Sequence, residues 1–194
     1  MRGVAQPDDC ILTTDRLLIR PWRLDEADRF FDIHRRSEVV RWLSGVPMTD
    51  RQEALERLER YEEELTADAR FGTWAVVECT RDFPAGSVLL KPLPNGNGEI
   101  EIGWHLHPDS WGRGIATEAA IALLAYGVAN GVEEVWAVTH LDNYRSAAVC
   151  HKIGMRLLGI TDRWYPDPSL MFWAGSRAGQ EPSLDAEEPA PIAL

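Results

Sequence analysis

The spacing of apolar side chains along this chain switches between the period of a helix and the period of a strand. Apolar residues at i, i+3 and i+4 predict helices, whereas alternating runs, or runs rich in β-branched and aromatic residues, predict strands. The predicted helices are residues 24–36, 49–65, 117–129 and 143–153. The predicted strands are residues 10–20, 73–79, 87–91, 99–107, 132–140, 156–160 and 169–173. Three of these strands follow one another through short turns, which predicts an antiparallel meander over residues 73–107.

Local signals mark the ends of several of these elements. A bend at residues 13–15 interrupts the first strand, and residues 39–43 form a short apolar segment. Thr49 is the expected N-cap of the second helix, with Gln52 three residues later as in a capping box. The third helix ends at an Asn-Gly pair, residues 130–131, which suits a left-handed stop.

Both ends of the chain differ from its middle. From about residue 175 the sequence has three prolines, four acidic residues and one arginine, with few hydrophobic residues. This composition predicts an acidic, proline-containing disordered tail over residues 176–194, and we expect residues 1–9 to be flexible. A single folded domain over residues 10–175 fits the length of 194 residues.

Charge and composition exclude several classes of function. Twenty Lys and Arg residues against 31 Asp and Glu residues give a net charge of −11. Such a surface repels phosphate backbones and anionic lipids, so we expect neither a nucleic acid nor a membrane as a partner, whereas an amine is favoured. No stretch approaches the roughly 18 apolar residues of a membrane span, and we find no secretory signal. The three cysteines lie far apart, which favours a cytoplasmic location.

The most specific chemistry lies between the strand at residues 99–107 and the helix at residues 117–129. There, Gly112 and Gly114 flank Arg113 in a turn. A helix N-terminus gathers unpaired N–H groups and positive potential, and glycine lets the backbone approach an anion closely. The turn therefore predicts a pyrophosphate cradle, to which Arg113 could add a charge contact. It matches neither the P-loop nor the dinucleotide-binding pattern, and a tight turn without a ligand is the alternative.

Two further stretches join this turn in a pattern that resembles the GNAT acyl-CoA N-acetyltransferases, most closely the Rim-type branch of ribosomal-protein N-terminal acetyltransferases. The opening pattern L-x-T-x-R-L-x-L-R-x-W is similar to Leu12, Thr14, Arg16, Leu17, Ile19, Arg20 and Trp22. The loop pattern Q/R-x-x-G-x-G/A is matched by Trp111, Gly112, Arg113, Gly114, Ile115 and Ala116. The last stretch comprises Asn143, Ser146, Lys152, Gly154 and Met155. The stretches follow the family's order over residues 10–175 and are specific as a set.

The resemblance implies an α/β (α+β) fold with a mixed, mostly antiparallel central sheet flanked by helices. The strands at residues 99–107 and 132–140 would splay apart and admit the thioester of acetyl-CoA, the implied cofactor. Backbone groups at Leu106 and His107 would pair with the pantetheine arm, and the amides of residues 112–117 would hold the pyrophosphate. The implied cofactor-binding residues are Leu106, His107, Trp111, Gly112, Arg113, Gly114, Ile115, Ala116, Thr117, Asn143 and Ser146.

The resemblance also implies transfer of the acetyl group to a primary amine by direct attack in a ternary complex. The amine must lose a proton, so the site needs a base. Glu101 is the first candidate base, and its alternative role is that of a cross-strand or exposed-face residue. His105 is the second candidate, and its alternative is a half-buried structural histidine. His105 and His107 could also imitate a metal pair, but we see no third ligand and predict no metal.

The group that protonates the departing CoA is marked less clearly. Cys150 stands where many members of the family carry tyrosine, and a buried free cysteine is usually inert packing. The Rim-type branch implies Ser146 instead, with a helix N-cap as its alternative role. Tyr144 and Tyr165 could substitute for the missing tyrosine.

The acceptor is expected to be a protein N-terminus or a small-molecule amine. The aromatic residues that could line its pocket are Trp42, Trp104, Trp164 and Tyr165. The alternatives to this reaction are a different acyl-CoA, a CoA-binding sensor without turnover, and a structural protein with an empty glycine turn. Many members of the family form dimers, so a homodimer is compatible with the resemblance, although the sequence itself does not predict one.

Overall fold

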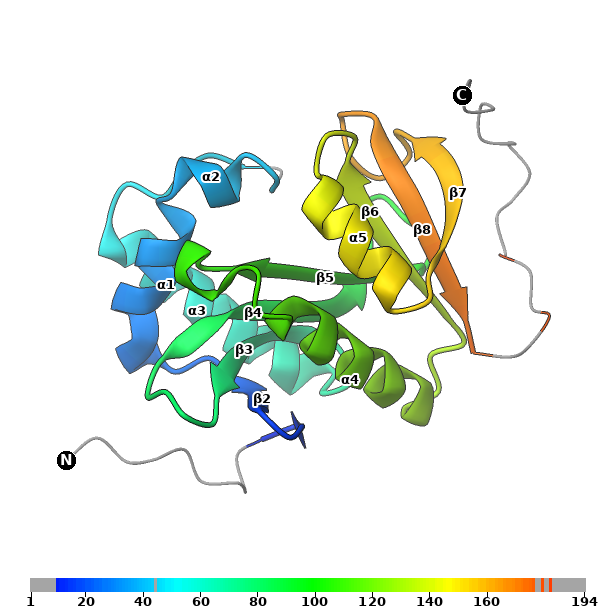
Figure 1. Cartoon of the computed structure of the whole chain (residues 1–194). Coiled ribbons are helices and arrows are strands. Elements are labelled where there is room, and N and C mark those ends of the chain that lie inside the picture. Colours follow the sequence, from blue (N-terminus) through cyan, green and yellow to red (C-terminus); the bar gives the residue numbers. More distant parts are fainter. Residues whose placement is uncertain (1–9, 44, 177–178, 180–181, 183–194) are drawn as a thin grey trace.

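The computed structural model describes residues 10–43, 45–176, 179 and 182 (Figure 1). The expected flexible start and nearly all of the expected tail lie outside these residues. The elements are β1 (Leu12–Thr13), β2 (Leu17–Pro21), η2 (Leu24–Glu26), α1 (Ala27–His34), α2 (Ser37–Val40), α3 (Arg51–Ala67), β3 (Gly72–Glu78), β4 (Pro84–Pro92), β5 (Ile100–Leu106), η3 (Pro108–Ser110), α4 (Ile115–Ala129), β6 (Glu134–His140), α5 (Tyr144–Lys152), β7 (Arg156–Thr161) and β8 (Ser169–Gly175). Among the described residues, no helix is both long and apolar enough to cross a bilayer.

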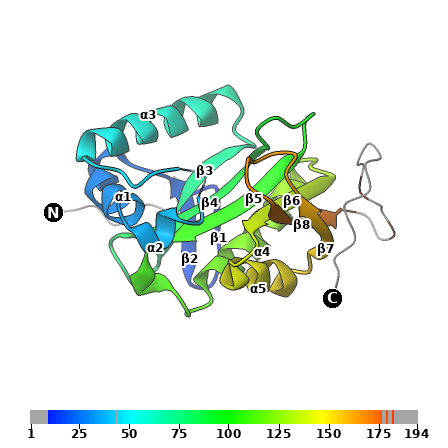
Figure 2. The same ribbon diagram turned by 90° about the horizontal axis from the view of Figure 1, so that it is seen from above.

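The described strands form one sheet with helices on both faces. Its strand order is β1-β2-β3-β4-β5-β6-β8-β7, and β5 and β6 are its parallel pair, the other neighbours being antiparallel. Seen from above, α1 and α3 lie over one face, while α4 and α5 lie over the other (Figure 2). The predicted mixed, mostly antiparallel sheet flanked by helices is therefore confirmed.

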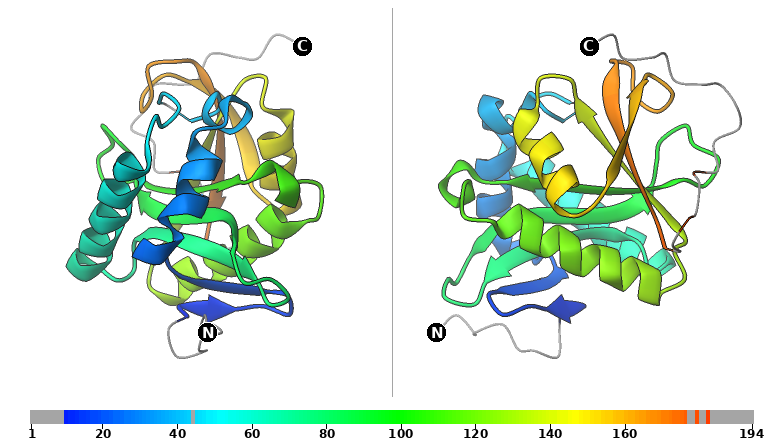
Figure 3. Two further views of the ribbon diagram at one scale, coloured as in Figure 1. Left: turned by 90° about the vertical axis from the view of Figure 1, so that its left-hand side faces the viewer. Right: turned by 45° about the vertical axis from the view of Figure 1, so that its right-hand side comes forward.

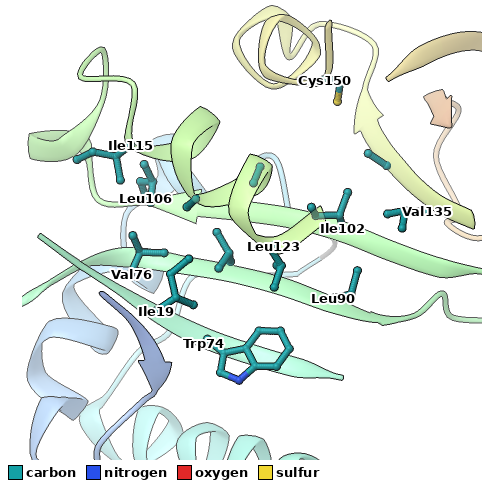
Figure 4. Packing of buried hydrophobic residues seen from close by; sticks show 14 of the residues in the cluster. Ile19, Trp74, Val76, Leu90, Ile102, Leu106, Ile115, Leu123, Val135 and Cys150 are labelled. Atoms are coloured by element: carbon teal, nitrogen blue, oxygen red, sulfur yellow. The ribbon is translucent and has the colours of Figure 1, made fainter. Parts of the chain in front are cut away.

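The central strand β3 shows why the sheet needs helices on both of its faces. Trp74 and Val76 join the cluster that α4 covers, whereas Ala75 and Val77 join the cluster beneath α1 and α3 (Figure 4). Successive side chains of a strand point to opposite faces, so an apolar run of this kind must be buried on both. Full burial of one large apolar side chain contributes about 1.5–3 kcal/mol, which fixes the layers.

The chain begins with a hairpin, whereas a single strand was expected over residues 10–20. β1 and β2 pair antiparallel, with Leu12 opposite Ile19. The N–H of Leu17 donates to the Thr14 hydroxyl oxygen at 3.0 Å. Hydroxyl groups of this kind replace a backbone partner and stabilise a turn, so the predicted bend is a full reversal of the chain.

The predicted starts of the first two helices are displaced. The first helix is divided into η2 and α1, and the apolar segment after it contains the end of α2. The N-cap of α3 is Asp50, whose carboxylate accepts from the N–H groups of Gln52 at 2.8 Å and Glu53 at 3.1 Å. The assignment of Thr49 is therefore wrong, because a carboxylate satisfies two amides and also suits the helix dipole. Thr49 instead donates its hydroxyl to Glu53 at 2.6 Å.

β4 begins earlier than predicted, at Pro84, and the chain passes very close to β5 at Gly86. A Cβ atom at this position would lie 2.3 Å from the His105 carbonyl oxygen and 2.6 Å from the Leu106 Cα atom. Both are backbone atoms of a paired strand, so neither can move aside. The close contact fixes β4 against the end of β5 that leads into the glycine turn.

We expect Gly86→Ala to lower the free energy of unfolding by about 1–3 kcal/mol, because the methyl group overpacks a site bounded by backbone. Denaturant unfolding followed by circular dichroism would measure it. Gly45→Ala is the matched control, since a Cβ atom there meets nothing within 4 Å. Equal stability of the two variants would contradict the close approach.

Candidate active site

The two central strands of the sheet meet at one point and then separate. β5 and β6 share a single register position, Glu101 opposite Trp136. Beyond it, β5 stays paired with β4 and β6 stays paired with β8, so the two strands diverge toward their carboxyl ends (Figure 3). The splay predicted for the strands at residues 99–107 and 132–140 is present in the fold.

The splay leaves backbone groups of β5 without a neighbouring strand. The N–H of His107 donates to the Ala85 carbonyl at 2.9 Å, which sets the alternation of the β4–β5 ladder. The amide groups of Trp104 and Leu106 then face β6. The Leu106 carbonyl accepts from the Trp111 indole N–H at 2.9 Å, so the Leu106 N–H and both polar groups of Trp104 remain on this edge.

His107 does not fit the role that the resemblance implied. Its N–H is bonded to β4, and its carbonyl accepts from the N–H of Ser110 at 2.9 Å. Its ring contacts a carboxylate oxygen of Asp32 at 3.0 Å and accepts from the Asp109 N–H at 3.1 Å. The backbone edge that could bind an added strand is therefore that of Trp104 and Leu106, and His107 fixes the turn that follows.

The glycine turn has the conformation of an anion-binding site. Gly112 and Gly114 have φ angles of +73° and +78°, in the left-handed region that favours glycine. Gly114 is the N-cap of α4 and makes no side-chain capping bond. The first N–H groups of α4, at residues 115–117, therefore point out of the helix end, where the dipole is positive. Such an arrangement can bind a phosphate or pyrophosphate group.

The charged side chains nearest this turn form ion pairs. Arg113 donates two hydrogen bonds of 2.6 Å to the Glu78 carboxylate, so its guanidinium fixes the loop to the end of β3. The guanidinium is therefore not free for the charge contact with an anion that the sequence suggested. On the other side, Glu118 accepts from the Thr14 hydroxyl at 2.5 Å and from Arg16 Nε at 2.7 Å. Thr14 and Arg16 belong to the first sequence motif and Glu118 follows the second, so this contact joins two motifs.

A groove continues from the turn along the start of α4. It has a volume of about 570 Å³ and runs between the β1–β2 turn and the end of α5. Its lining residues are Thr14, Asp15, Gly114, Thr117, Glu118, Ile121, Ala122 and Lys152. The groove is therefore continuous with the anion-binding end of the helix.

Glu101 lies where the strands part, and its environment suits a base. Its side chain is 7% exposed, and Tyr165 donates its hydroxyl to Oε2 at 2.8 Å. Burial raises the pKa of Glu101 to about 7, against the opposing effects of the Tyr165 hydrogen bond and of Lys91. Oε1 has no hydrogen-bond partner among the described residues and is not among their fully buried unpaired atoms. It therefore borders accessible space.

His105 has a different environment. Its Nε2 atom lies 3.1 Å from Nε2 of His34, a buried residue of α1. Burial and then the neighbouring charges hold the pKa of His105 well below its ordinary value, and burial lowers the pKa of His34 to about 4. Both rings are neutral near pH 7, so Glu101 is the stronger of the two candidate bases.

The start of α5 separates the candidate acids. Asn143 is the N-cap, and its side-chain oxygen accepts from the Ser146 N–H at 3.2 Å, so Ser146 is not itself the cap. The Ser146 hydroxyl makes no hydrogen bond within the described residues. Cys150 is completely buried in the main core cluster, and burial raises the pKa of its thiol to about 12 (Figure 4). Tyr144 is 75% exposed and Tyr165 is bound to Glu101, which leaves Ser146 as the candidate donor.

The aromatic residues expected around an acceptor lie in different surroundings. Trp104 packs against the main core cluster, and Trp164 is 2% exposed and lies 5.5 Å from the Trp136 ring, so both are structural. Trp42 lies after α2 with its ring 5.6 Å from that of His140 at the end of β6. This contact connects the α1–α2 side of the molecule with the far strand of the splay.

Sequence reasoning missed three residues of this region. Glu118 follows the glycine turn and was given no role, and Tyr165 was considered only as an acid or a pocket aromatic. His34 lies within the helix predicted at residues 24–36 and was given no role. A charged or titratable residue on an otherwise apolar helix face was the one signal that could have identified Glu118 and His34.

Comparison with known proteins agrees with this fold. A family model described as "Acetyltransferase (GNAT) domain" matches residues 16–156. The uncharacterized N-acetyltransferase p20 of Bacillus licheniformis is 24% identical over 150 residues, which cover 77% of this chain and 84% of that protein. The acetyltransferase of Agrobacterium tumefaciens has a similar structure, with a TM-score of 0.72, 23% identity and coverage of 85% and 94%. The microcin C7 self-immunity acetyltransferase MccE, in complex with acetyl-CoA and AMP, gives a TM-score of 0.73, 15% identity and coverage of 86% and 96%.

We expect Cys150 to resist a maleimide at pH 8 in the folded protein, because its thiol is buried and stays protonated. The exposed Cys79 should react quickly, and mass mapping of peptides would identify the modified residues. A variant with both Cys10→Ser and Cys79→Ser, labelled before and after unfolding, isolates Cys150. Rapid labelling of native Cys150 would mean that the thiol faces the splay.

Proposed function

Because the chain belongs to the GNAT acetyltransferase family, we propose that it transfers an acetyl group from acetyl-CoA directly to a primary amine in a ternary complex. It is an acetyltransferase, and acetyl-CoA is the cosubstrate of this family. One observation carries the proposal most directly. A buried carboxylate, Glu101, stands with one free oxygen at the position where the two central strands separate.

The cofactor would occupy the splay and the glycine turn. The backbone edge of Trp104 and Leu106 would bind the pantetheine arm as an added strand. The amides of residues 112–117 would hold the pyrophosphate, with Arg113 acting through its backbone because its side chain is paired with Glu78. Asn143 and Ser146 would flank the thioester from α5. The thioester carbon would then lie near Glu101, on the side of β5 that α1 and α3 cover.

Starting from a charged amine, two protons must leave the nitrogen and one must reach the departing sulfur. A free amine has a pKa of about 7.7–8.0 as a terminal group or about 10.4 as lysine, so most of it is charged near neutrality. Glu101, with a pKa of about 7, would accept the proton of the amine through Oε1. The neutral nitrogen then bonds to the thioester carbon and gives up its second proton to water, and the carbon–sulfur bond breaks. The Ser146 hydroxyl would donate a hydrogen bond to the departing thiolate, which takes its proton from solvent.

The acceptor we propose is a protein N-terminus or a small amine. The net charge of −11 favours approach of a cation, and the Rim-type motifs favour a terminal amine. A CoA-binding module without turnover is the alternative from another class. Such a module does not need a carboxylate with a raised pKa beside the splay, whereas an amine acyltransferase needs one as its base. The cytoplasm supplies acetyl-CoA and remains the expected location.

Gly114→Trp should weaken binding of acetyl-CoA by at least tenfold, because an indole there fills the space in front of the α4 amides. Isothermal titration calorimetry measures the affinity. Gly131→Trp is the matched control at the other end of α4, since Gly131 also has a positive φ angle and open space around it. Equal losses in the two variants would assign the effect to backbone strain and contradict the cradle.

Glu101→Gln should lower kcat/KM by about 10²–10⁴-fold with little change in acetyl-CoA affinity. Below a pH of about 7 the wild-type rate should rise tenfold per pH unit, after correction for the amine's own titration, because the carboxylate form increases there. This rise of the rate with pH should be absent from Glu101→Gln. Glu99→Gln, two residues earlier, is the control and should retain the profile. An unchanged profile in Glu101→Gln would exclude this residue as the base.

Glu101→Gln should also raise the free energy of unfolding above neutral pH. The folded protein holds the Glu101 proton up to a pH of about 7, whereas the unfolded chain releases it near 4.5, so stability falls as the pH rises through this window. Glutamine removes the loss, and at pH 8 the gain is on the order of 3 kcal/mol at most. Thermal unfolding at pH 4 and pH 8 measures the difference. A variant less stable than the wild type at pH 8 would contradict the raised pKa.

A further inference from the structure

The contact between His34 and His105 has no role in the proposed reaction. His34 lies on α1 and is 5% exposed, with its ring stacked on Phe30 at a centroid distance of 4.0 Å. His105 is a half-buried residue of β5. Two facing imidazoles in a core are an expensive arrangement unless their hydrogen bonds are matched, because a buried polar atom without a partner costs about 1–3 kcal/mol.

The hydrogen bonds determine where the protons are. Nδ1 of His34 lies 2.8 Å from the Phe30 carbonyl oxygen, which can only accept, so Nδ1 carries the proton. The ring is neutral, so its Nε2 atom is an acceptor. His105 must then donate from Nε2 across the 3.1 Å contact. In neutral His105 the Nδ1 atom then carries no proton. Its lone pair points in a fixed direction and can accept a hydrogen bond.

That lone pair is not used by another group of the described residues. Among the described residues Nδ1 of His105 has no hydrogen-bond partner, and it is not one of their fully buried unpaired atoms. It therefore borders accessible space. His105 shares a face of β5 with Glu101, because residues four apart on a strand point the same way. They are roughly 13 Å apart along the strand, too far for both to act on one amine proton.

The charges near the pair favour a neutral ring. Arg57 of α3 and Lys91 of β4 both oppose protonation of His105, and Arg57 also opposes protonation of His34. An imidazolium here would face two cations in a poorly solvated place. The pair is thus suited to accept a hydrogen bond from a ligand and unsuited to hold a charge.

We propose that His34 is a positioning residue for the acceptor: it holds His105 with the proton on Nε2, so that Nδ1 accepts a hydrogen bond from a donor group beyond the reacting amine. This inference rests on the proposed acyl transfer near Glu101. Because of the distance along β5, the acceptor is an extended molecule with a second N–H group, such as a peptide, and not a simple alkylamine.

The ring protons can be tested without any activity. Nitrogen-15 spectra of the histidine rings in the full chain at pH 7 should show His34 protonated at Nδ1 and His105 protonated at Nε2. His34→Gln should preserve the His105 tautomer, since a glutamine oxygen can accept from Nε2. His34→Leu should abolish the preference of His105 for the Nε2-protonated tautomer. A charged His105, or one protonated at Nδ1 in the wild type, would overturn the proposal.

Turnover then tests the role toward the acceptor. With a peptide amine, His34→Leu should raise KM about tenfold with kcat within twofold, and His34→Gln should restore most of KM. With an alkylamine that has no second donor, neither variant should change KM. Ile33→Val, a buried neighbour on α1, is the control for stability, and acetyl-CoA affinity should stay the same throughout.

The outcomes separate the inference from the function on which it rests. An unchanged KM for the peptide in His34→Leu, or an equal rise with both amines, would overturn the positioning role while the acetyltransferase remains. No turnover by the wild type with any amine would contradict the proposed function, and the acceptor role with it, whatever tautomers the spectra show.

Discussion

The site depends on a single constraint, the meeting of β5 and β6 at one register position, Glu101 opposite Trp136. Backbone N–H and C=O groups of a buried sheet must find partners, so two central strands that separate leave a row of groups that a ligand can satisfy. The separation also places Glu101 at the inner end of the opening, where burial raises its pKa. Backbone edge and base therefore come from one feature of the sheet.

The electrostatics of the glycine turn show how an acidic protein can bind an anionic cofactor. Glu78 and Glu118 both stand next to the turn: Glu78 is paired with Arg113 and Arg81, and Glu118 is paired with Arg16. The charges fix the loop from two sides and largely cancel. What remains for a ligand at the turn is a set of uncharged N–H groups at the positive end of α4, and Lys152 adds a cation to the lining of the adjoining groove.

Much of this fold could be predicted from local sequence, and the missing parts share a physical reason. Strand alternation and the glycine turn depend on neighbouring residues, so they were found, together with Glu101 as a candidate base. The contacts Arg16–Glu118, His34–His105 and Glu101–Tyr165 join residues 102, 71 and 64 positions apart, which no local pattern reports. The N-cap at Asp50 was missed because Thr49 is also a good cap by type.

The measurement that tests the central claim most directly is release of CoA from acetyl-CoA by the full chain against a panel of peptide and small-molecule amines. The acetylated product should be identified by mass spectrometry. Acyl transfer beside Glu101 predicts that CoA release requires an amine, matches acetylated amine mole for mole, and fails for the quaternary ammonium analogue. Tight binding of acetyl-CoA with no release in the presence of any amine would contradict it, and the splay would then be a cofactor-binding site without chemistry.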